Sequence, residues 1–226
     1  MSAPQVIAVL GGTGREGSGL ALRWAHAGYR VILGSRSAER GAAAAAELNA
    51  LLPAAALPVT AAPLAEAAAA AAIVVLAVPY AVQADTAEAV RDGLAGKIVI
   101  DVTVPLVPPR VDRVQLPAGG SAVEALQRRL GSAVRVVSAF QNVSAVHLRD
   151  LGHPVACDVL VCADDAAAAD IVAGLARSAG FTAWLAGPLA NSVATEAFTS
   201  VLIALNRRYK VAASGLRITG LPGAAA

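Results

Sequence analysis

The chain has 226 residues, enough for one large domain or for one domain with a smaller lobe. With 57% hydrophobic and 15% charged residues, it has the composition of a globular protein that buries a sizeable core. The formal net charge of +2 is too small to indicate a nucleic-acid partner, which requires a basic face. The apolar run over residues 67–84 is broken by Pro79, Tyr80 and Gln83, so it predicts a helix and a buried strand rather than a membrane span. We therefore expect neither nucleic acid nor a membrane as a partner.

Strand-like and helix-like segments alternate along the first 140 residues. The strand-like runs are apolar throughout, which is typical of a parallel sheet covered by helices on both faces. The alanine-rich stretches between them predict packing helices, because alanine is the strongest helix former. The strand-like runs are residues 6–10, 29–34, 73–78, 97–102 and 134–139, and the clearest helix-like runs are residues 38–52 and 85–94.

Residues 12–17, with the sequence GTGREG, have the spacing of a dinucleotide phosphate loop between a strand and a helix. Gly12 permits the tight turn, Gly14 lets the backbone approach a pyrophosphate, and Gly17 allows the helix and strand to pack closely. The N-terminus of the following helix offers free N–H groups and the positive end of its dipole to phosphate. The sequence therefore predicts a dinucleotide site.

The stretch GSRSAER follows the second strand, where many such sites carry an acid for the ribose hydroxyls. Here Ser35 and Arg36 occupy that place, 23 and 24 positions after Gly12. A carboxylate would repel a 2′-phosphate, whereas Arg36 can bind it with paired, charge-assisted hydrogen bonds. Ser35 can donate to the same phosphate, and Arg40 adds a second cation one helical turn later. The pattern predicts NADP(H) rather than NAD(H).

From about residue 138 the pattern changes to a second set of elements. Residues 157–162 and 181–186 are strand-like, residues 166–180 are helical, and a closing helix is expected over residues 191–209. Cys157 and Cys162 lie five strand steps apart, roughly 16 Å, which is beyond disulfide reach. Two buried free thiols suit a reducing cytoplasm.

Five segments together resemble the F420-dependent NADP oxidoreductases over nearly the whole chain, from about Val6 to Leu221. They are LGGTGREGSGLALRWAHAGYRVILGSRSAER, LAVPY, VVSAFQNVSA, DVLVCADD and AGPLANS. The resemblance implies an α/β fold, a Rossmann-type parallel sheet with helices on both faces and a small C-terminal α/β lobe. Residues 1–140 would form the NADP-binding domain, and residues 141–226 a lobe that completes the F420 cleft. It further implies a homodimer that transfers a hydride reversibly between nicotinamide C4 and C5 of coenzyme F420.

The resemblance also assigns roles to individual positions. Thr13, Val143 and Thr199 would position the two rings, with no residue acting as acid or base. Val78 and Pro79 would border the nicotinamide. The residues expected to bind the cofactors are Gly12, Thr13, Gly14, Arg15, Glu16, Ser35, Arg36, Arg40, Val78, Pro79, Gln141, Asn142 and Ala145. Many relatives carry His at the position of Gln141, and because Gln does not titrate near neutral pH, only a hydrogen-bonding contact is expected there.

The sequence lacks the motifs that mark several other classes of enzyme. No cluster has metal-ligand spacing, and no nucleophile turn is present, so no metal is expected. Asp101 is the last residue of a predicted strand, and we expect its carboxylate to cap or shape a turn rather than to act as an acid or base. Hydride transfer between two flat carriers needs alignment and water exclusion more than proton relays. Three alternatives stay open: an NADPH-dependent flavin or ferric reductase, an imine or ketone reductase of related fold, and a non-catalytic NADP-sensing module.

Overall fold

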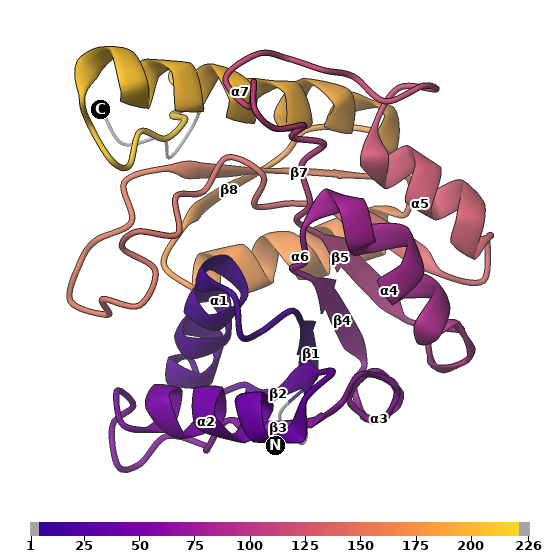
Figure 1. Ribbon diagram of the computed structural model, residues 1–226, viewed down its shortest axis with the longest axis vertical. Coiled ribbons are helices and arrows are strands. Elements are labelled where there is room, and N and C mark those ends of the chain that lie inside the picture. The colour runs from indigo at the N-terminus through magenta and orange to yellow at the C-terminus, as the bar shows by residue number, and fades with distance from the viewer. Residues whose placement is uncertain (1–4, 222–226) are drawn as a thin grey trace.

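The structure is a computed structural model that describes residues 5–221. One sheet of eight strands runs through it, in the order β3-β2-β1-β4-β5-β6-β7-β8 (Figure 1). The strands are β1 Val6–Leu10, β2 Arg30–Ser35, β3 Thr60–Pro63, β4 Ile73–Leu76, β5 Ile98–Asp101, β6 Arg135–Ser138, β7 Asp158–Ala163 and β8 Thr182–Leu185. The α-helices are α1 Arg15–His26, α2 Ala38–Asn49, α3 Leu64–Ala70, α4 Gln83–Ala89, α5 Ala122–Leu130, α6 Ala166–Ser178 and α7 Ser192–Tyr209.

The first six strands are parallel and form a Rossmann fold. Their order, β3-β2-β1-β4-β5-β6, reverses direction between β1 and β4, which creates a crevice at the carboxyl edge of the sheet. β7 pairs antiparallel with β6, and β8 pairs parallel with β7, so the C-terminal strands extend the same sheet. The division of the chain near residue 140 stays a prediction.

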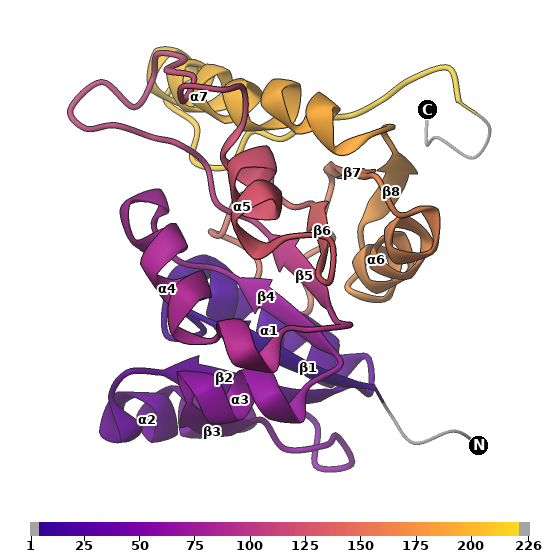
Figure 2. The ribbon, with the colours of Figure 1, turned by 90° about the vertical axis from the view of Figure 1, so that its right-hand side faces the viewer.

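Alternate residues of β1 enter two separate hydrophobic cores. Ile7 and Val9 pack with α1, α2 and α6 on one face, whereas Ala8 and Leu10 pack with α3, α4 and α5 on the other. Figure 2 shows α3, α4 and α5 on the near side of the sheet, with α1 behind it. Both faces are thus covered, which explains why the central strands are apolar without alternation.

The predicted strands and the closing helix are confirmed, with small differences at their ends. β3 and α5 were not predicted. β3 has four residues, ends in Pro63 and lies at the edge of the sheet beside β2, so it has too little pattern to be recognised. The two cysteines are free and buried, as expected.

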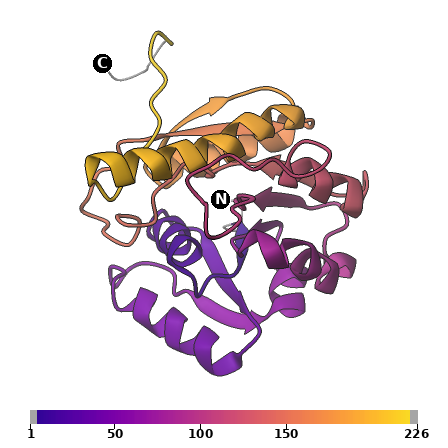
Figure 3. The same cartoon turned by 45° about the horizontal axis from the view of Figure 1, so that its top comes forward.

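α7 lies along the carboxyl side of the sheet (Figure 3), and the segment after it pairs with the start of β7, where the Asp158 N–H donates to the Leu216 carbonyl at 2.8 Å. Its buried residues include Thr195, Glu196 and Ser200. Glu196 accepts hydrogen bonds from the backbone N–H groups of Ala122 (2.8 Å) and Val123 (3.1 Å), the first residues of α5. A carboxylate at a helix N-terminus is favoured by the helix dipole, so this contact joins α7 to α5.

Candidate functional site

The phosphate loop joins β1 to α1 at the carboxyl edge of the sheet. A Cβ at Gly12 would lie 2.7 Å from Leu33 Cδ2, and one at Gly17 would lie 2.7 Å from the Gly11 carbonyl oxygen. Gly11 has a φ of +88°, and a Cβ there would collide with the carbonyl of Ala77. Packing therefore excludes side chains at these three positions. Gly14 is the N-cap of α1 and makes no side-chain cap, so the helix presents N–H groups toward the crevice.

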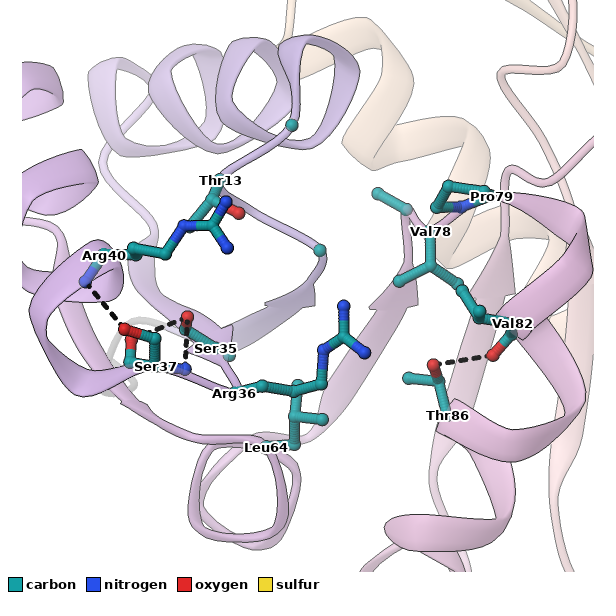
Figure 4. Close-up of a pocket in the computed structure, with 14 residues that line it drawn as sticks. Thr13, Ser35, Arg36, Ser37, Arg40, Leu64, Val78, Pro79, Val82 and Thr86 are labelled. Atoms are coloured by element: carbon teal, nitrogen blue, oxygen red, sulfur yellow. Dashed lines mark hydrogen bonds between the residues drawn. The ribbon is translucent and has the colours of Figure 1, made fainter.

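A cavity of about 470 Å³ opens in front of this loop. Figure 4 shows Arg36 and Arg40 extending into it from the end of β2 and the start of α2. Among residues 5–221, neither arginine forms a salt bridge, so both guanidinium groups are available to an anion. The lining residues are Gly11, Thr13, Gly14, Gly34, Ser35, Arg36, Ser37, Arg40, Leu64, Ala77, Val78, Pro79, Val82 and Thr86.

The turn after β2 is built by two serines. The Ser35 hydroxyl donates to the Ser37 carbonyl (2.8 Å) and accepts from the Ser37 N–H (3.2 Å). Ser37 in turn caps α2 by accepting from the Arg40 N–H at 3.3 Å. Ser35 therefore shapes the turn that directs Arg36 and Arg40 into the cavity. Ser37 lines the cavity but was missed, although a serine before the AER start of a helix is a recognisable N-cap signal.

A buried polar cluster lies at the end of β5, beside the crevice. Gln83 donates to the Asp101 carboxylate and to Thr103 Oγ1 (2.8 Å), and the Thr103 N–H donates to Asp101 Oδ1 (2.9 Å). Burial raises the pKa of Asp101 to about 6, although the hydrogen bonds from Thr103 and Gln83 oppose that rise. The side chain of Asp101 has no exposed surface. The expected role of Asp101 in a turn is thus confirmed. Its hydrogen-bond partner Gln83 was not predicted from the sequence.

A second, smaller pocket of about 160 Å³ lies between α7 and the segment after β6. Asn142 donates to the Thr195 carbonyl (2.8 Å) and to Thr199 Oγ1 (3.2 Å), and Thr199 donates to the Gln141 carbonyl (2.7 Å). These bonds fix the segment against α7. The pocket is lined by Gln141, Asn142, Val143, Ser144, Thr199, Leu202, Ile203, Asn206 and Ser214.

The backbone before this pocket is strained and firmly held. Phe140 has a φ of +74°, which is unfavourable for a residue with a side chain. Its ring packs edge-on against Trp24 and Phe181, with centroid distances of 5.7 Å to each. The aromatic cluster stabilises a conformation that turns the following residues toward α7.

The chain is similar over nearly its full length to characterised proteins. Residues 6–105 match the family described as NADP oxidoreductase coenzyme F420-dependent. The F420-dependent NADP reductase of Methanothermobacter marburgensis is 40% identical over 221 residues, covering 96% of this chain and 99% of that protein. The enzyme of the same name from Methanocaldococcus jannaschii is 39% identical, covering 95% and 98%. This chain belongs to the F420-dependent NADP reductase family.

A solved structure of similar sequence has the same fold. The structure described as such a reductase from Arthrobacter sp. FB24 is 30% identical, has a TM-score of 0.78, and covers 95% of this chain and 99% of that one. None of the helices within residues 5–221 is long and apolar enough to cross a membrane. In that same range, no group of three or more His, Cys, Asp or Glu side chains could hold a metal ion.

In this reductase, most of the predicted site residues line one of two spaces, the larger cavity or the smaller pocket. Gly14, Thr13, Ser35, Arg36, Arg40, Val78 and Pro79 line the larger cavity, and Gln141, Asn142, Val143 and Thr199 line the smaller pocket. Gly12 is buried within the phosphate loop and lines neither space. Arg15, Glu16 and Ala145 line neither space. Arg15 is exposed. Glu16 is partly buried, and burial together with the charge of Asp101 raises its pKa to about 8. Ala145 packs against the core.

Proposed function

We propose that this protein catalyses reversible hydride transfer between NADP(H) and coenzyme F420. Similarity to F420-dependent NADP reductases over nearly the whole chain carries this proposal. The larger cavity fits NADP(H) because its lining combines a glycine-rich phosphate loop with two arginines that form no salt bridge within residues 5–221, and it includes no acidic residue. In the proposed complex Arg36 and Arg40 bind the 2′-phosphate, and the N-terminus of α1 faces the pyrophosphate.

The protein's own contribution to the reaction is positioning. Bound nicotinamide and deazaflavin supply the hydride donor and acceptor, and reduction of F420 also takes up one proton. Val78 and Pro79 form an apolar wall that excludes water from the nicotinamide. Thr13, Val143 and Thr199 hold the two rings in contact from the two sides of the crevice. Asp101 is kept out of acid–base work by its hydrogen bonds to Gln83 and Thr103.

A direct assay tests this function. Purified protein is mixed with F420 and NADPH, the deazaflavin absorbance band is followed, and NADH replaces NADPH in the control. Rapid bleaching with NADPH and slow bleaching with NADH is the expected result. NADPH binding without any change in F420, with free flavins or imines reduced instead, would favour one of the other reductase activities. Binding without turnover of any acceptor would favour a sensing module.

We further propose that the protein is a homodimer that works in the cytoplasm. Phe198, Val201, Leu205 and Tyr209 occupy one face of α7 and are 37%, 39%, 38% and 69% exposed. An apolar stripe of this kind on a surface helix is typical of an interface. The free buried thiols Cys157 and Cys162 fit a reducing compartment. The proposed division is a nucleotide domain over residues 1–140 and a smaller C-terminal lobe over residues 141–226, whose last five residues lie outside those the structure describes.

A further inference from the structure

One acid in the first turn of α1 is partly buried and has no partner. Within residues 5–221, the Glu16 carboxyl group forms neither a hydrogen bond nor a salt bridge. A buried carboxyl group without a partner is costly in its charged form. Burial therefore raises the pKa of Glu16 to about 8, and the charge of Asp101 adds to this rise. At pH 7 the side chain is mostly neutral.

The helical spacing of α1 shows which way this acid faces. Gly19 and Arg23 follow Glu16 by three and seven positions, so all three lie on one face of the helix. Both later residues touch the segment after β6. A Cβ at Gly19 would collide with Leu148, and Arg23 Nε donates to the Leu148 carbonyl at 2.9 Å. Glu16 is the first of the three, so it lies at the carboxyl edge of the sheet, where the charge of Asp101 at the end of β5 acts on it.

The same helical turn borders one end of the larger cavity. In the proposed complex the two arginines bind the 2′-phosphate and the start of α1 faces the pyrophosphate. The nicotinamide then lies at the other end, beside Val78 and Pro79 (Figure 4). Gly17, the residue after Glu16, packs on this end, because a Cβ there would lie 3.1 Å from Ala77 Cβ. Glu16 lines neither space, so it acts on the ring through its charge rather than through contact.

We propose that Glu16 compensates the positive charge that the nicotinamide ring gains when bound NADPH is oxidised. The inference rests on the proposed NADP(H) site. The reduced ring is neutral and the oxidised ring is a cation, and a nearby cation stabilises a carboxylate. Glu16 therefore loses its proton when NADPH gives up its hydride. The C4–H bond breaks and its electron pair passes to C5 of F420. The O–H bond of Glu16 breaks, and its proton balances the one that reduced F420 binds at a ring nitrogen, so atoms and charge are conserved.

Other ionisable groups lie near this face of α1, and the test has to separate them from Glu16. Asp101 at the end of β5 has a pKa of about 6, and Glu196 of α7, whose pKa is about 7, interacts with Asp101. The remaining charged or titratable groups are Arg15 and Arg23 on α1 and His147, Asp150 and His153 in the segment after β6. Comparing the two redox forms of the nucleotide at each pH cancels every group that responds equally to both, including the 2′-phosphate.

Nucleotide affinities across pH test this link without F420. The Kd values of NADP⁺ and NADPH are measured by titration calorimetry from about pH 6.5 to 9.5, with the wild type and Glu16→Gln. In the wild type, the ratio of the Kd for NADP⁺ to the Kd for NADPH is expected to fall roughly 10-fold as pH rises, because the ionised acid favours only the cationic ring. In Glu16→Gln, which cannot ionise, the ratio is expected to stay within about twofold.

A control variant and a second measurement separate this effect from a change in folding. Glu39 is the exposed second residue of α2, as Glu16 is the second residue of α1, so Glu39→Gln is expected to keep the fall in the ratio. The second measurement needs no variant. Near pH 7.5 in weak buffer, the wild type is expected to release about half a proton per NADP⁺ bound and almost none per NADPH.

Three results would contradict the role assigned to Glu16. They are a ratio that does not change with pH in the wild type, a fall of equal size in Glu16→Gln, and equal proton release with the two nucleotides. A protein that binds neither nucleotide would overturn the proposed site together with this inference. The expected pH dependence in a protein that reduces no F420 would support this inference and overturn the proposed function alone.

Discussion

At the scale of single residues, we propose that selectivity for NADP(H) depends on Arg36 and Arg40, which form no salt bridge within residues 5–221. Arg36 and Arg40 extend into the larger cavity, and no residue that lines it carries a carboxylate. A guanidinium binds phosphate through paired hydrogen bonds that a ribose hydroxyl cannot replace. The preference for NADPH over NADH should therefore reside in these side chains.

Arg36→Ala is expected to raise the KM for NADPH about 10- to 100-fold, because charge-assisted hydrogen bonds to the 2′-phosphate are lost. The KM for NADH should stay within about twofold. Steady-state kinetics with both cofactors measures the effect. Arg30→Ala removes an exposed arginine at the start of β2, on the opposite edge of the sheet, and should change neither value. Equal losses with NADPH and NADH would place the 2′-phosphate elsewhere.

The residues predicted from sequence are those whose role depends on local chain geometry. Gly12, Gly14 and Arg36 belong to one strand–loop–helix–strand unit, so their spacing alone brings them together. Gln83 and Asp101 meet only because β4 and β5 are neighbours in the sheet, and no pattern in the sequence records that pairing. Gln141 was expected as a hydrogen-bonding contact. Its Nε2 donates to the Asp101 backbone carbonyl, and the sequence does not show this bond because only the fold brings the two residues together.

At the scale of elements, a buried arginine on α1 holds the loop that follows the smaller pocket. Arg23 is 7% exposed and donates to the carbonyls of Leu148 (2.9 Å), His147 (3.1 Å), Asp150 (2.9 Å) and His153 (3.2 Å). It also reaches the Ala179 carbonyl at the end of α6. This single side chain ties the first helix to segments about 125 to 156 residues later in the sequence.

Arg23→Met is expected to lower the free energy of unfolding by about 3–5 kcal/mol, because several buried carbonyl groups lose their donor at once. Urea denaturation followed by circular dichroism measures the change. Arg149→Met is the matched control in the same loop, since Arg149 makes an exposed salt bridge to Glu47 at 3.3 Å. Such surface pairs contribute about 0–1 kcal/mol. Similar losses in the two variants would contradict the role assigned to Arg23.

The outer face of α7 carries the proposed dimer interface. Leu205 lies in the middle of the exposed apolar stripe, so Leu205→Glu places a charge in the interface. This variant is expected to elute as a monomer in light scattering coupled to size exclusion, whereas the wild type should have twice the chain mass of 22.5 kDa. A wild-type protein that is monomeric at micromolar concentration would refute the interface.

At the scale of the whole molecule, buried carboxyl groups make stability depend on pH. Burial raises the pKa of Asp101 to about 6 and that of Glu196 to about 7. Burial, followed by the charge of Asp101, raises the pKa of Glu16 to about 8. In the unfolded chain these groups ionise near pH 4, so the folded state binds more protons between about pH 4 and 8. Stability therefore falls as pH rises through that range.

The free energy of unfolding without cofactors is expected to be lower at pH 8 than at pH 5, by about 1–2 kcal/mol from Asp101 alone. Urea titrations across the range measure it. Glu16→Gln removes the group that ionises last, so it should flatten the decline between pH 6 and 8. Glu66→Gln, at an exposed position on α3, should leave the profile unchanged. Stability that rises with pH over this range would contradict these assignments.

The most direct test of direct hydride transfer is isotopic. NADPH carrying deuterium at both C4 positions is mixed with F420 and the protein in ordinary water, and the reduced coenzyme is examined by mass spectrometry and NMR. The proposed stacking of the two rings predicts a single deuterium at C5 of the deazaflavin, carried over without exchange with solvent. Reduced F420 with hydrogen from water at C5, or F420 that stays oxidised while NADPH is bound, would contradict direct transfer between the two coenzymes.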